Sequence, residues 1–252
     1  MAERPLTIAR PRRRKSLQWV GDIEAVAFDA YGTLINFHDD HFASTMASIC
    51  AAQGLAADGA DFWRRFVRHA IAFYTKSRAN GHSYHRYGDM WPAHFGAAFR
   101  SLRLDGDPHV ASVHLREALA SADAHPDAHD VVNALRPRYR LALLSNADDD
   151  FLLPCLARNQ FQFPVLVSSE RARAMKPNAA IFQLLAGELG VKPSSILHVG
   201  DSPFADVVGA REAGLRVAWI NRAAMRKPRR VPEPDLRLRS LRELLPILDA
   251  CG

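Results

Sequence analysis

Short apolar runs that end in polar side chains alternate with helical segments along most of this 252-residue chain. The runs that we expect to form strands are 25–29, 140–144, 165–168, 195–199 and 216–220, and the expected helices among the later ones are 151–158, 179–190 and 205–213. Strands that are apolar on both faces are typical of a parallel sheet covered by helices on either side. The sequence therefore predicts an α/β fold built on a doubly wound parallel sheet.

Residues 39–125 interrupt this alternation with a different pattern. Apolar residues recur there at spacings of three and four, which is typical of amphipathic helices; the segments are 41–53, 60–78, 88–103 and 109–120. We therefore expect a second, inserted domain made of helices. The expected division is a basic tail over 1–21 with 17–20 able to dock on the core, an α/β core over 22–38 and 126–252, and a helical cap domain over 39–125.

Composition limits the surroundings and partners of such a protein. No run approaches the ~18 to 20 apolar residues of a membrane span, and the 3 cysteines are far apart. We therefore expect a cytoplasmic protein without a membrane partner, a disulfide framework or a zinc site. The net charge is +6, but much of the excess lies in 4–15 and 222–230, without interleaved aromatics. We expect no nucleic-acid partner, and a positive field that steers a small anionic substrate.

The first expected strand delivers one carboxylate, Asp29, into a turn that contains Gly32. An ionised side chain at the carboxyl end of a buried strand is costly unless it has a use, and ligands bind at that edge of open α/β sheets. Asp29 is therefore our candidate nucleophile. Taken alone, an aspartate here is equally typical of a turn or of a helix N-cap.

Three later segments favour a site over a turn. Leu143–Asn146 ends in a hydroxyl and an amide, Met175–Asn178 carries Lys176 before Pro177, and His198–Asp206 carries two acids. Pro177 restricts the residue before it to extended conformations, so the local backbone aims the ammonium of Lys176. Each segment alone has an ordinary alternative, namely turn chemistry, a solvated lysine or an acid that starts a helix.

In this order, the four segments resemble the four motifs of the haloacid dehalogenase superfamily, over residues 23–38 and 131–220. The insert is similar to the superfamily's helical cap of the first (C1) class. The resemblance implies a Rossmann-like core and a reaction in which Asp29 forms an aspartyl intermediate that water hydrolyses. It also implies that Ser145 donates a hydrogen bond to the substrate, that Asn146 and Thr33 support the same loop, and that Lys176 stabilises the substrate together with Asp29.

The resemblance further implies a Mg²⁺ site. Its protein ligands would be Asp29, Asp201 and the main-chain carbonyl of Tyr31, with Asp206 behind them. Mg²⁺ prefers oxygen ligands and keeps several waters, so one or two carboxylates and a substrate oxygen suffice.

Tyr31 departs from the pattern of the superfamily's phosphatases, which have an aspartate two residues after the nucleophile as the acid for the leaving alcohol. Tyrosine has a pKa near ~10 and is a poorer acid at neutral pH. The stretch Asp29–Leu34 instead resembles the first motif of the L-2-haloacid dehalogenases, whose leaving halide needs no proton. Against that reading, those enzymes work without metal and usually have a Ser-x-Asn segment where this chain has Gly200–Ser202. They also carry a tyrosine six residues after the lysine, where this chain has Phe182.

The expected cap holds a further candidate, because Trp63 and Arg64 resemble a Trp-Arg pair whose arginine helps to receive the halide. We take Arg64 as a substrate-binding candidate, with a solvated helix position as the alternative. Aromatic residues of the cap are expected to pack its core, with one or two lining the substrate pocket; they are Phe62, Phe66, Phe73, Tyr74, Tyr84, Tyr87 and Trp91. The close histidine pairs, such as His38 with His41 and His125 with His129, lack the spacing of a metal centre.

The preferred hypothesis from sequence is a Mg²⁺-dependent hydrolase of a small phosphorylated metabolite. The first alternative is a hydrolytic L-2-haloacid dehalogenase, and the second is a weakly active member that acts through binding or regulation. The sequence leaves open the substrate, the leaving group, the acid that replaces the missing aspartate, the role of the basic tail, and the oligomeric state, including a homodimer.

Overall fold

A parallel sheet forms the centre of the computed structural model, which describes residues 17–79 and 84–249. Six strands in the described part of the chain pair in the order β3-β2-β1-β4-β5-β6, and every pair is parallel. The strands are β1 Ala25–Phe28, β2 Arg140–Ser145, β3 Val165–Ser168, β4 Ile196–Gly200, β5 Arg216–Ile220 and β6 Leu236–Leu238. The predicted doubly wound α/β fold is confirmed, with β6 as an edge strand that the sequence analysis missed.

The register of the central strand explains why the predicted motifs meet. Phe28, the last residue of β1, lies opposite Leu143 of β2 and Val199 of β4. The residues that follow these strands therefore emerge at the same edge of the sheet. This edge is where ligands bind in sheets of this kind.

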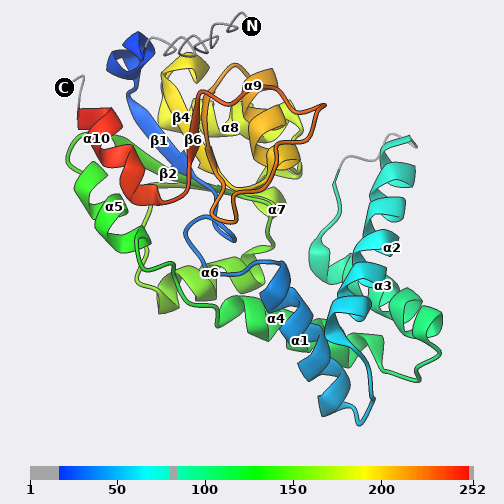
Figure 1. Cartoon of the computed structure of the whole chain (residues 1–252). Coiled ribbons are helices and arrows are strands. Elements are labelled where there is room, and N and C mark those ends of the chain that lie inside the picture. The colour runs from blue at the N-terminus through cyan, green and yellow to red at the C-terminus, as the bar shows by residue number, and fades with distance from the viewer. Residues whose placement is uncertain (1–16, 80–83, 250–252) are drawn as a thin grey trace, which may run out of the picture.

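Helices cover both faces of the sheet, and successive residues of β1 alternate between two apolar clusters. Val26 and Phe28 belong to the cluster under α5 (Ala128–Leu135) and α10 (Leu244–Asp249), and Ala25 and Ala27 belong to the cluster under α8 (Ala179–Leu189). Figure 1 shows α5 and α10 on one side of the strands and α8 and α9 on the other. The core helices are α5 Ala128–Leu135, α6 Asp149–Arg158, α7 Ser169–Ala172, α8 Ala179–Leu189, α9 Gly209–Glu212 and α10 Leu244–Asp249.

The helix predicted over 205–213 has a different form in the structure. It begins earlier, as a wide turn at Pro203–Val208, and continues as α9. Ser202 caps the turn by accepting a hydrogen bond from the N–H of Ala205 at 3.1 Å. Three short 3-10 turns complete the described core: Gln18–Asp22, Pro193–Ser195 and Leu241–Glu243.

The expected tail lies only partly within the described residues. Residues 1–16 are outside them, whereas Val20 is buried against the core and the guanidinium of Arg216 lies 5.2 Å from the centre of the Trp19 ring. The segment before β1 therefore contacts the core through Trp19 and Val20, whereas Leu17 is 37% exposed.

Four helices of the described chain form the insert, close to the ranges that periodicity indicated. They are α1 Asp39–Ala52, α2 Gly59–Ala79, α3 Tyr87–Leu102 and α4 Pro108–Ala120. Aromatic rings pack their interior, as between Phe62 and Phe99, whose centres are 5.0 Å apart. Figure 1 shows these helices grouped beside the core, with α4 next to α6. None of the described helices is long and apolar enough to span a bilayer.

The two segments that connect the core with the insert are bonded to each other. Ile35 and Ala124 form an antiparallel bridge. The N–H of Asn36 donates to the carbonyl of Asp123, and that of His125 donates to the carbonyl of Leu34, both at 2.8 Å. The chain therefore leaves and re-enters the core at one place.

Candidate active site

Asp29 occupies the position after β1 and is almost buried, with 6% of its surface exposed. Its N–H donates to the carbonyl of Val199 at 2.9 Å, which extends the pairing with β4 by one residue. The turn that follows brings Gly32 against Asp201. A Cβ on Gly32 would lie 2.4 Å from Oδ2 of Asp201, and the φ of Gly32 is +88°. Glycine is therefore required for this close approach.

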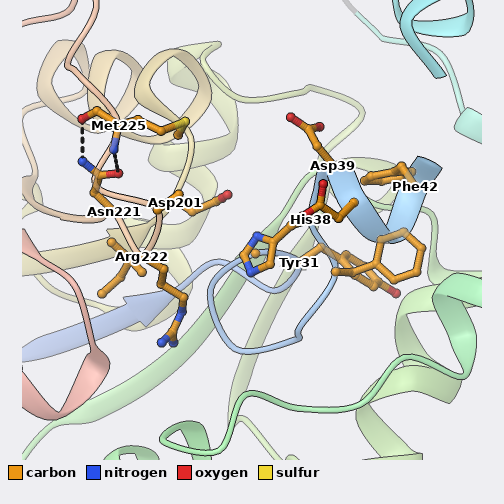
Figure 2. Close-up of a pocket in the computed structure, with 13 residues that line it drawn as sticks. Tyr31, His38, Asp39, Phe42, Asp201, Asn221, Arg222 and Met225 are labelled. Atoms are coloured by element: carbon orange, nitrogen blue, oxygen red, sulfur yellow. Dashed lines mark hydrogen bonds between the residues drawn. The ribbon is translucent and has the colours of Figure 1, made fainter. Parts of the chain in front are cut away.

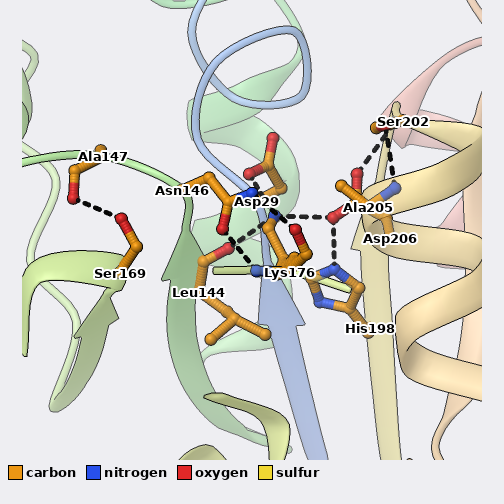
Figure 3. Close-up of polar contacts among 10 residues, drawn as sticks. All are labelled: Asp29, Leu144, Asn146, Ala147, Ser169, Lys176, His198, Ser202, Ala205 and Asp206. Carbon is orange, nitrogen blue, oxygen red and sulfur yellow. Dashed lines mark hydrogen bonds and ion pairs between the residues drawn. The ribbon is translucent and has the colours of Figure 1, made fainter. Parts of the chain in front are cut away.

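Lys176 is the centre of the polar network in Figure 3. Its Nζ donates to Oδ1 of Asp29 at 2.6 Å, to Oδ1 of Asp206 at 2.6 Å and to the carbonyl of Leu144 at 3.1 Å. Burial alone would lower the pKa of Lys176, but Asp206 and Asp29 raise it above its ordinary value. The ammonium therefore stays charged. The same contact opposes the rise that burial causes in the pKa of Asp29.

Asn146 holds the backbone of Lys176 from two sides. Its Oδ1 accepts the N–H of Lys176 at 2.7 Å, and its Nδ2 donates to the carbonyl of Lys176 at 3.0 Å. Ser145 ends β2 and is buried beside Ser168 of β3. The second motif therefore fixes the lysine through an amide, while the hydroxyl of Ser145 lies at the same strand end.

Thr33 does not share this loop, which corrects the expectation that Asn146 and Thr33 support the same one. Its carbonyl accepts a hydrogen bond from Nη2 of Arg222 at 3.2 Å, and its Oγ1 is buried without a hydrogen-bond partner in the described part of the chain. Arg222 is in turn held by the carboxylate of Asp127 at 2.8 and 3.0 Å. The loop after the nucleophile is therefore fixed separately, from the β5 side.

Tyr31 directs its hydroxyl to backbone groups. The hydroxyl lies 3.3 Å from the carbonyl of Leu119 in the cap and 3.4 Å from that of Phe151 in the core, and its one proton is shared between these two acceptors. Burial raises the pKa of Tyr31 above its ordinary value. The phenol is therefore fully protonated and committed to two carbonyl acceptors, so it is badly placed as an acid for a leaving group.

Three carboxylates converge at the edge of the sheet. Asp29, Asp201 and Asp206 each offer an oxygen, and these oxygens lie within 4.8 Å of one another. Burial and the charges of Asp29 and Asp206 raise the pKa of Asp201 well above its ordinary value. Crowded like charges of this kind favour a bound cation, and an all-oxygen set suits Mg²⁺.

Asp206 differs from the other two acids because both of its oxygens have partners within the protein. Oδ1 contacts Lys176 and also Nε2 of His198 at 2.8 Å, and Oδ2 accepts the N–H of Ser202 at 2.8 Å. Burial would raise the pKa of Asp206, but Lys176 and His198 hold it below its ordinary value. Asp29 and Asp201 are the acids that could hold a metal ion directly, with Asp206 behind them.

His198 is a residue that the sequence analysis missed. It lies in the middle of β4, is completely buried, and packs edge-on against Phe182 with ring centres 5.6 Å apart. Its contact with Asp206 helps to orient the carboxylate that holds Lys176. The available signal was a polar residue within an otherwise apolar strand.

Arg64 lies away from this network. Its side chain is 64% exposed and pairs with Asp61, one turn earlier on α2, at 3.1 Å. The structure therefore brings together Asp29, Lys176, Asp201, Asp206 and the second-motif residues, and it does not bring Arg64 to them.

Two cavities adjoin the network and share Tyr31 and Phe42. The larger has a volume of about 710 Å³, and Figure 2 shows Asp201 and Arg222 on one side of it and His38 and Tyr31 on the other. The smaller has a volume of about 270 Å³ and is almost entirely apolar. Its lining includes the cap residues Trp63, Phe66, Ala70, Tyr74, Tyr87 and Trp91 and the core residues Asn146 and Phe151.

The site combines an acid that follows the central strand of a parallel sheet with a buried lysine bound to that acid, and the inserted helices lie beside the same edge. This is the arrangement of an α/β hydrolase with an inserted helical domain. The sequence profile of the haloacid dehalogenase-like hydrolases matches residues 23–214. The chain belongs to this family, as the four motifs indicated.

Curated relatives include both kinds of enzyme that the first motif left open. The haloacetate dehalogenase H-2 of Moraxella sp. (strain B) is 30% identical over 214 residues, which cover 79% of this chain and 86% of the relative. The (S)-2-haloacid dehalogenase 4A of Burkholderia cepacia is 27% identical, with 91% and 96% covered. The phosphoserine phosphatase of Thermus thermophilus is 30% identical, with 68% and 77% covered.

Solved structures agree on the fold. The L-2-haloacid dehalogenase RSc1362 superposes with a TM-score of 0.77 at 24% identity, over 90% of this chain and 99% of that one. The superposed part therefore includes residues of both the sheet domain and the insert of this chain. The balance between the two hypotheses shifts from the phosphatase to the dehalogenase, whose relatives cover more of the chain.

Proposed function

We propose that the protein is a hydrolytic dehalogenase of L-2-halo acids. The observation that carries the proposal is the hydroxyl of Tyr31, whose proton is shared between two backbone carbonyls in the place where a phosphatase of this superfamily has its acid. A leaving group at this site departs without a proton from that position. Halide is such a leaving group, and the dehalogenase relatives support this choice.

The reaction follows from the groups at the end of β1. A carboxylate oxygen of Asp29 attacks C2 of the substrate, a C–O bond forms, and the carbon–halogen bond breaks with its electron pair leaving on the halide. Water then attacks the carboxyl carbon of the aspartyl ester, which releases a 2-hydroxy acid and a proton and restores Asp29. Lys176 holds Asp29 by its 2.6 Å contact and offsets negative charge next to an anionic substrate.

The apolar cavity gives this proposal a substrate range. It lies beside Tyr31 and Asn146, which flank the nucleophile and its lysine, and apolar and aromatic residues of the cap form most of its lining. Such a surface accepts an alkyl substituent at C2 and offers no partner for a charged one. Substrates are therefore 2-halo acids with an apolar side chain.

Halide release tests the proposal. Purified protein is incubated with L-2-chloropropionate, with its D enantiomer as the control, in the presence of either EDTA or Mg²⁺. The expected result is chloride release from the L form alone, unchanged by EDTA. A single turnover in ¹⁸O-labelled water should leave the label in the peptide that contains Asp29. Absence of chloride release would overturn the proposal.

A second function is favoured by the three-carboxylate cluster, namely Mg²⁺-dependent hydrolysis of a small phosphorylated metabolite. A Mg²⁺ ion held by Asp29 and Asp201 would supply charge neutralisation beside the transferred phosphoryl group. Lys176 and Ser145 would then face the phosphoryl oxygens. Phosphate release from a panel of phosphate esters that stops with EDTA would support this function. Release of neither product would overturn both and favour a binding or regulatory role.

A further inference from the structure

The loop of the second motif also contacts the cap, through a residue to which neither reaction gives a role. The carboxylate of Asp148 lies two residues after Asn146, and its side chain is 0% exposed. Its Oδ1 accepts the N–H of Tyr87 at 3.0 Å, and its Oδ2 accepts the N–H of Gly88 at 2.8 Å. These are the first two N–H groups of α3. The carboxylate of a core residue therefore acts as the N-terminal cap of a helix in the inserted domain.

This arrangement differs from an ordinary helix cap. Asp148 stands at the N-cap position of its own helix, α6, yet its side chain makes no capping bond there. Arg86, the N-cap residue of α3, makes no side-chain capping bond within the described residues either. The first N–H groups of a helix need acceptors and attract negative charge. When the cap docks on the core, Asp148 therefore supplies the hydrogen-bond acceptors that the first two N–H groups of α3 need.

The same loop is fixed to the segment of the lysine. Asn146 makes two hydrogen bonds to the backbone of Lys176, at 2.7 and 3.0 Å. The carbonyl of Ala147 accepts from Oγ of Ser169 at 3.0 Å, as Figure 3 shows. Residues 146–148 therefore connect the catalytic lysine on one side with the start of α3 on the other.

Neighbouring contacts add to this junction between core and cap. The ring of Trp91 on α3 stacks on Phe151 of α6, with centres 5.4 Å apart and planes at 25°. Nε of Arg86 is buried, although the side chain as a whole is 39% exposed, and it lies 3.1 Å from Oε1 of Glu170 and 3.9 Å from Oδ2 of Asp148. Among these contacts, the two hydrogen bonds of Asp148 are the ones that reach the backbone of α3.

We infer that Asp148 is a positioning residue that couples docking of the cap to the placement of Lys176. When its two bonds are lost, α3 separates from the second-motif loop, and the loop no longer holds Asn146 firmly against the lysine backbone. The inference rests on the proposed function only in the choice of assay substrate, because both proposed reactions use Lys176.

Two variants break the link from opposite sides. Asp148→Asn removes the charge and one acceptor from the core, and Gly88→Pro removes one donor from the cap in the first helical turn, where the N–H has no partner within the helix. Gly88→Ala is the matched control, because it keeps the N–H and its Cβ would lie at an ordinary 3.6 Å from Oδ2 of Asp148. We expect the first two to lower kcat/KM by about 10- to 100-fold, mainly in kcat, since small misplacements at the reacting groups are costly. Gly88→Ala should leave it unchanged.

Amide hydrogen exchange tests the coupling without catalysis. The N–H of Lys176 is bonded to Asn146, so in Asp148→Asn and Gly88→Pro it should exchange about tenfold faster, as expected for a weakened hydrogen bond. The amide of His198 in β4 should be unchanged, which controls for general loosening, and urea unfolding shows that the variants are folded. In Asp148→Asn, the amide of Gly88 could exchange faster while the exchange of the Lys176 amide and the kcat of the enzyme stay unchanged. That result would mean that Asp148 only caps α3, and it would overturn the inference. If no substrate is turned over even by the wild type, the proposed function fails and the exchange at Lys176 still decides the inference.

Discussion

Two cations were predicted for the site, Lys176 at the edge of the sheet and Arg64 on the outer face of the cap, and their surroundings differ. Lys176 has a side chain that is 2% exposed, and two carboxylates fix its ammonium. Arg64 has a side chain that is 64% exposed and pairs within its own helix. The comparison teaches that the groups to which we assign the reaction lie in the core, where strand register places Asp29 and the bonds of Asn146 hold Lys176. The cap contributes most of the lining of the smaller cavity and the first N–H groups of α3, which bind Asp148.

The nucleophile gives the largest expected effect and tests the core side of this comparison. Asp29→Asn keeps the shape of the side chain but removes the attacking carboxylate. We expect a fall in kcat of about 10⁴- to 10⁶-fold, the scale seen when a covalent nucleophile is lost. Halide release under single-turnover and steady-state conditions measures it. Asp22→Asn, at an exposed position before β1, is the matched control. Retained turnover in Asp29→Asn would mean that another group attacks.

The apolar cavity tests the cap side. Ala70 of α2 lines it, and Ala70→Phe should fill part of it. We expect kcat/KM for L-2-bromohexanoate to fall by about tenfold or more relative to L-2-bromopropionate, which is the range for steric discrimination in an apolar pocket. Ala72→Phe, at an exposed position two residues later, should leave the ratio unchanged. An equal loss for both substrates would place the alkyl group elsewhere.

The ion pair between Asp127 and Arg222 holds the loop after the nucleophile through the carbonyl of Thr33, and it should affect stability more than catalysis. Burial would raise the pKa of Asp127, but the hydrogen bonds from Arg222, Ser240 and Leu241 lower it to about 2. Asp127→Asn should cost about 1–3 kcal/mol of unfolding free energy at pH 7, because an amide donor replaces one of the two oxygens that accept from these buried groups.

The same pair predicts a pH dependence. A carboxyl group whose pKa is lower in the folded state stabilises the protein above its unfolded pKa of about 3.9 and loses that contribution as the pH falls. The difference in urea stability between wild type and Asp127→Asn should therefore be constant at neutral pH and shrink between pH 4 and 2. A difference that is independent of pH would show that the charge of Asp127 is not the cause.

The smallest effect is expected at Arg64. Because the guanidinium is exposed and bonded to Asp61, Arg64→Ala should leave kcat/KM unchanged. Steady-state assays with both enantiomers of 2-chloropropionate check this. A loss of tenfold or more would mean that the cap moves toward the core when substrate binds and that this arginine reaches it. The contrast with Lys176 would then describe the free protein alone.

The position of the acids Asp29 and Asp201 was predictable because both follow neighbouring parallel strands. Asp29 and Asp201 come after β1 and β4, which pair directly, so an apolar run with an acid behind it was enough. The doubly wound sheet followed from the same runs. The strand β6 was missed because its 3 residues are too short to show a period.

The remaining features depend on tertiary contacts that spacing does not encode. Asn146 reaches the backbone of Lys176, a residue 30 positions later, and no local pattern distinguishes that use from a turn. Asp148 is one of three consecutive aspartates, and only the docking of α3 selects it. The aromatic residues of the cap were expected to pack, and which of them line the cavity follows from how four helices meet the core.

The bonded pair of connections between core and insert has a consequence for how such proteins diversify. Since Ile35 and Ala124 are bridge partners, the sheet domain is nearly closed on itself at the point where the insert departs. An exchange of everything between those two residues would leave the strand order intact. The chain thus crosses between the sheet domain and the insert at one place, although α3 and α4 also contact the core away from it, through Asp148 and Tyr31. A replacement insert would have to supply new partners for those two residues.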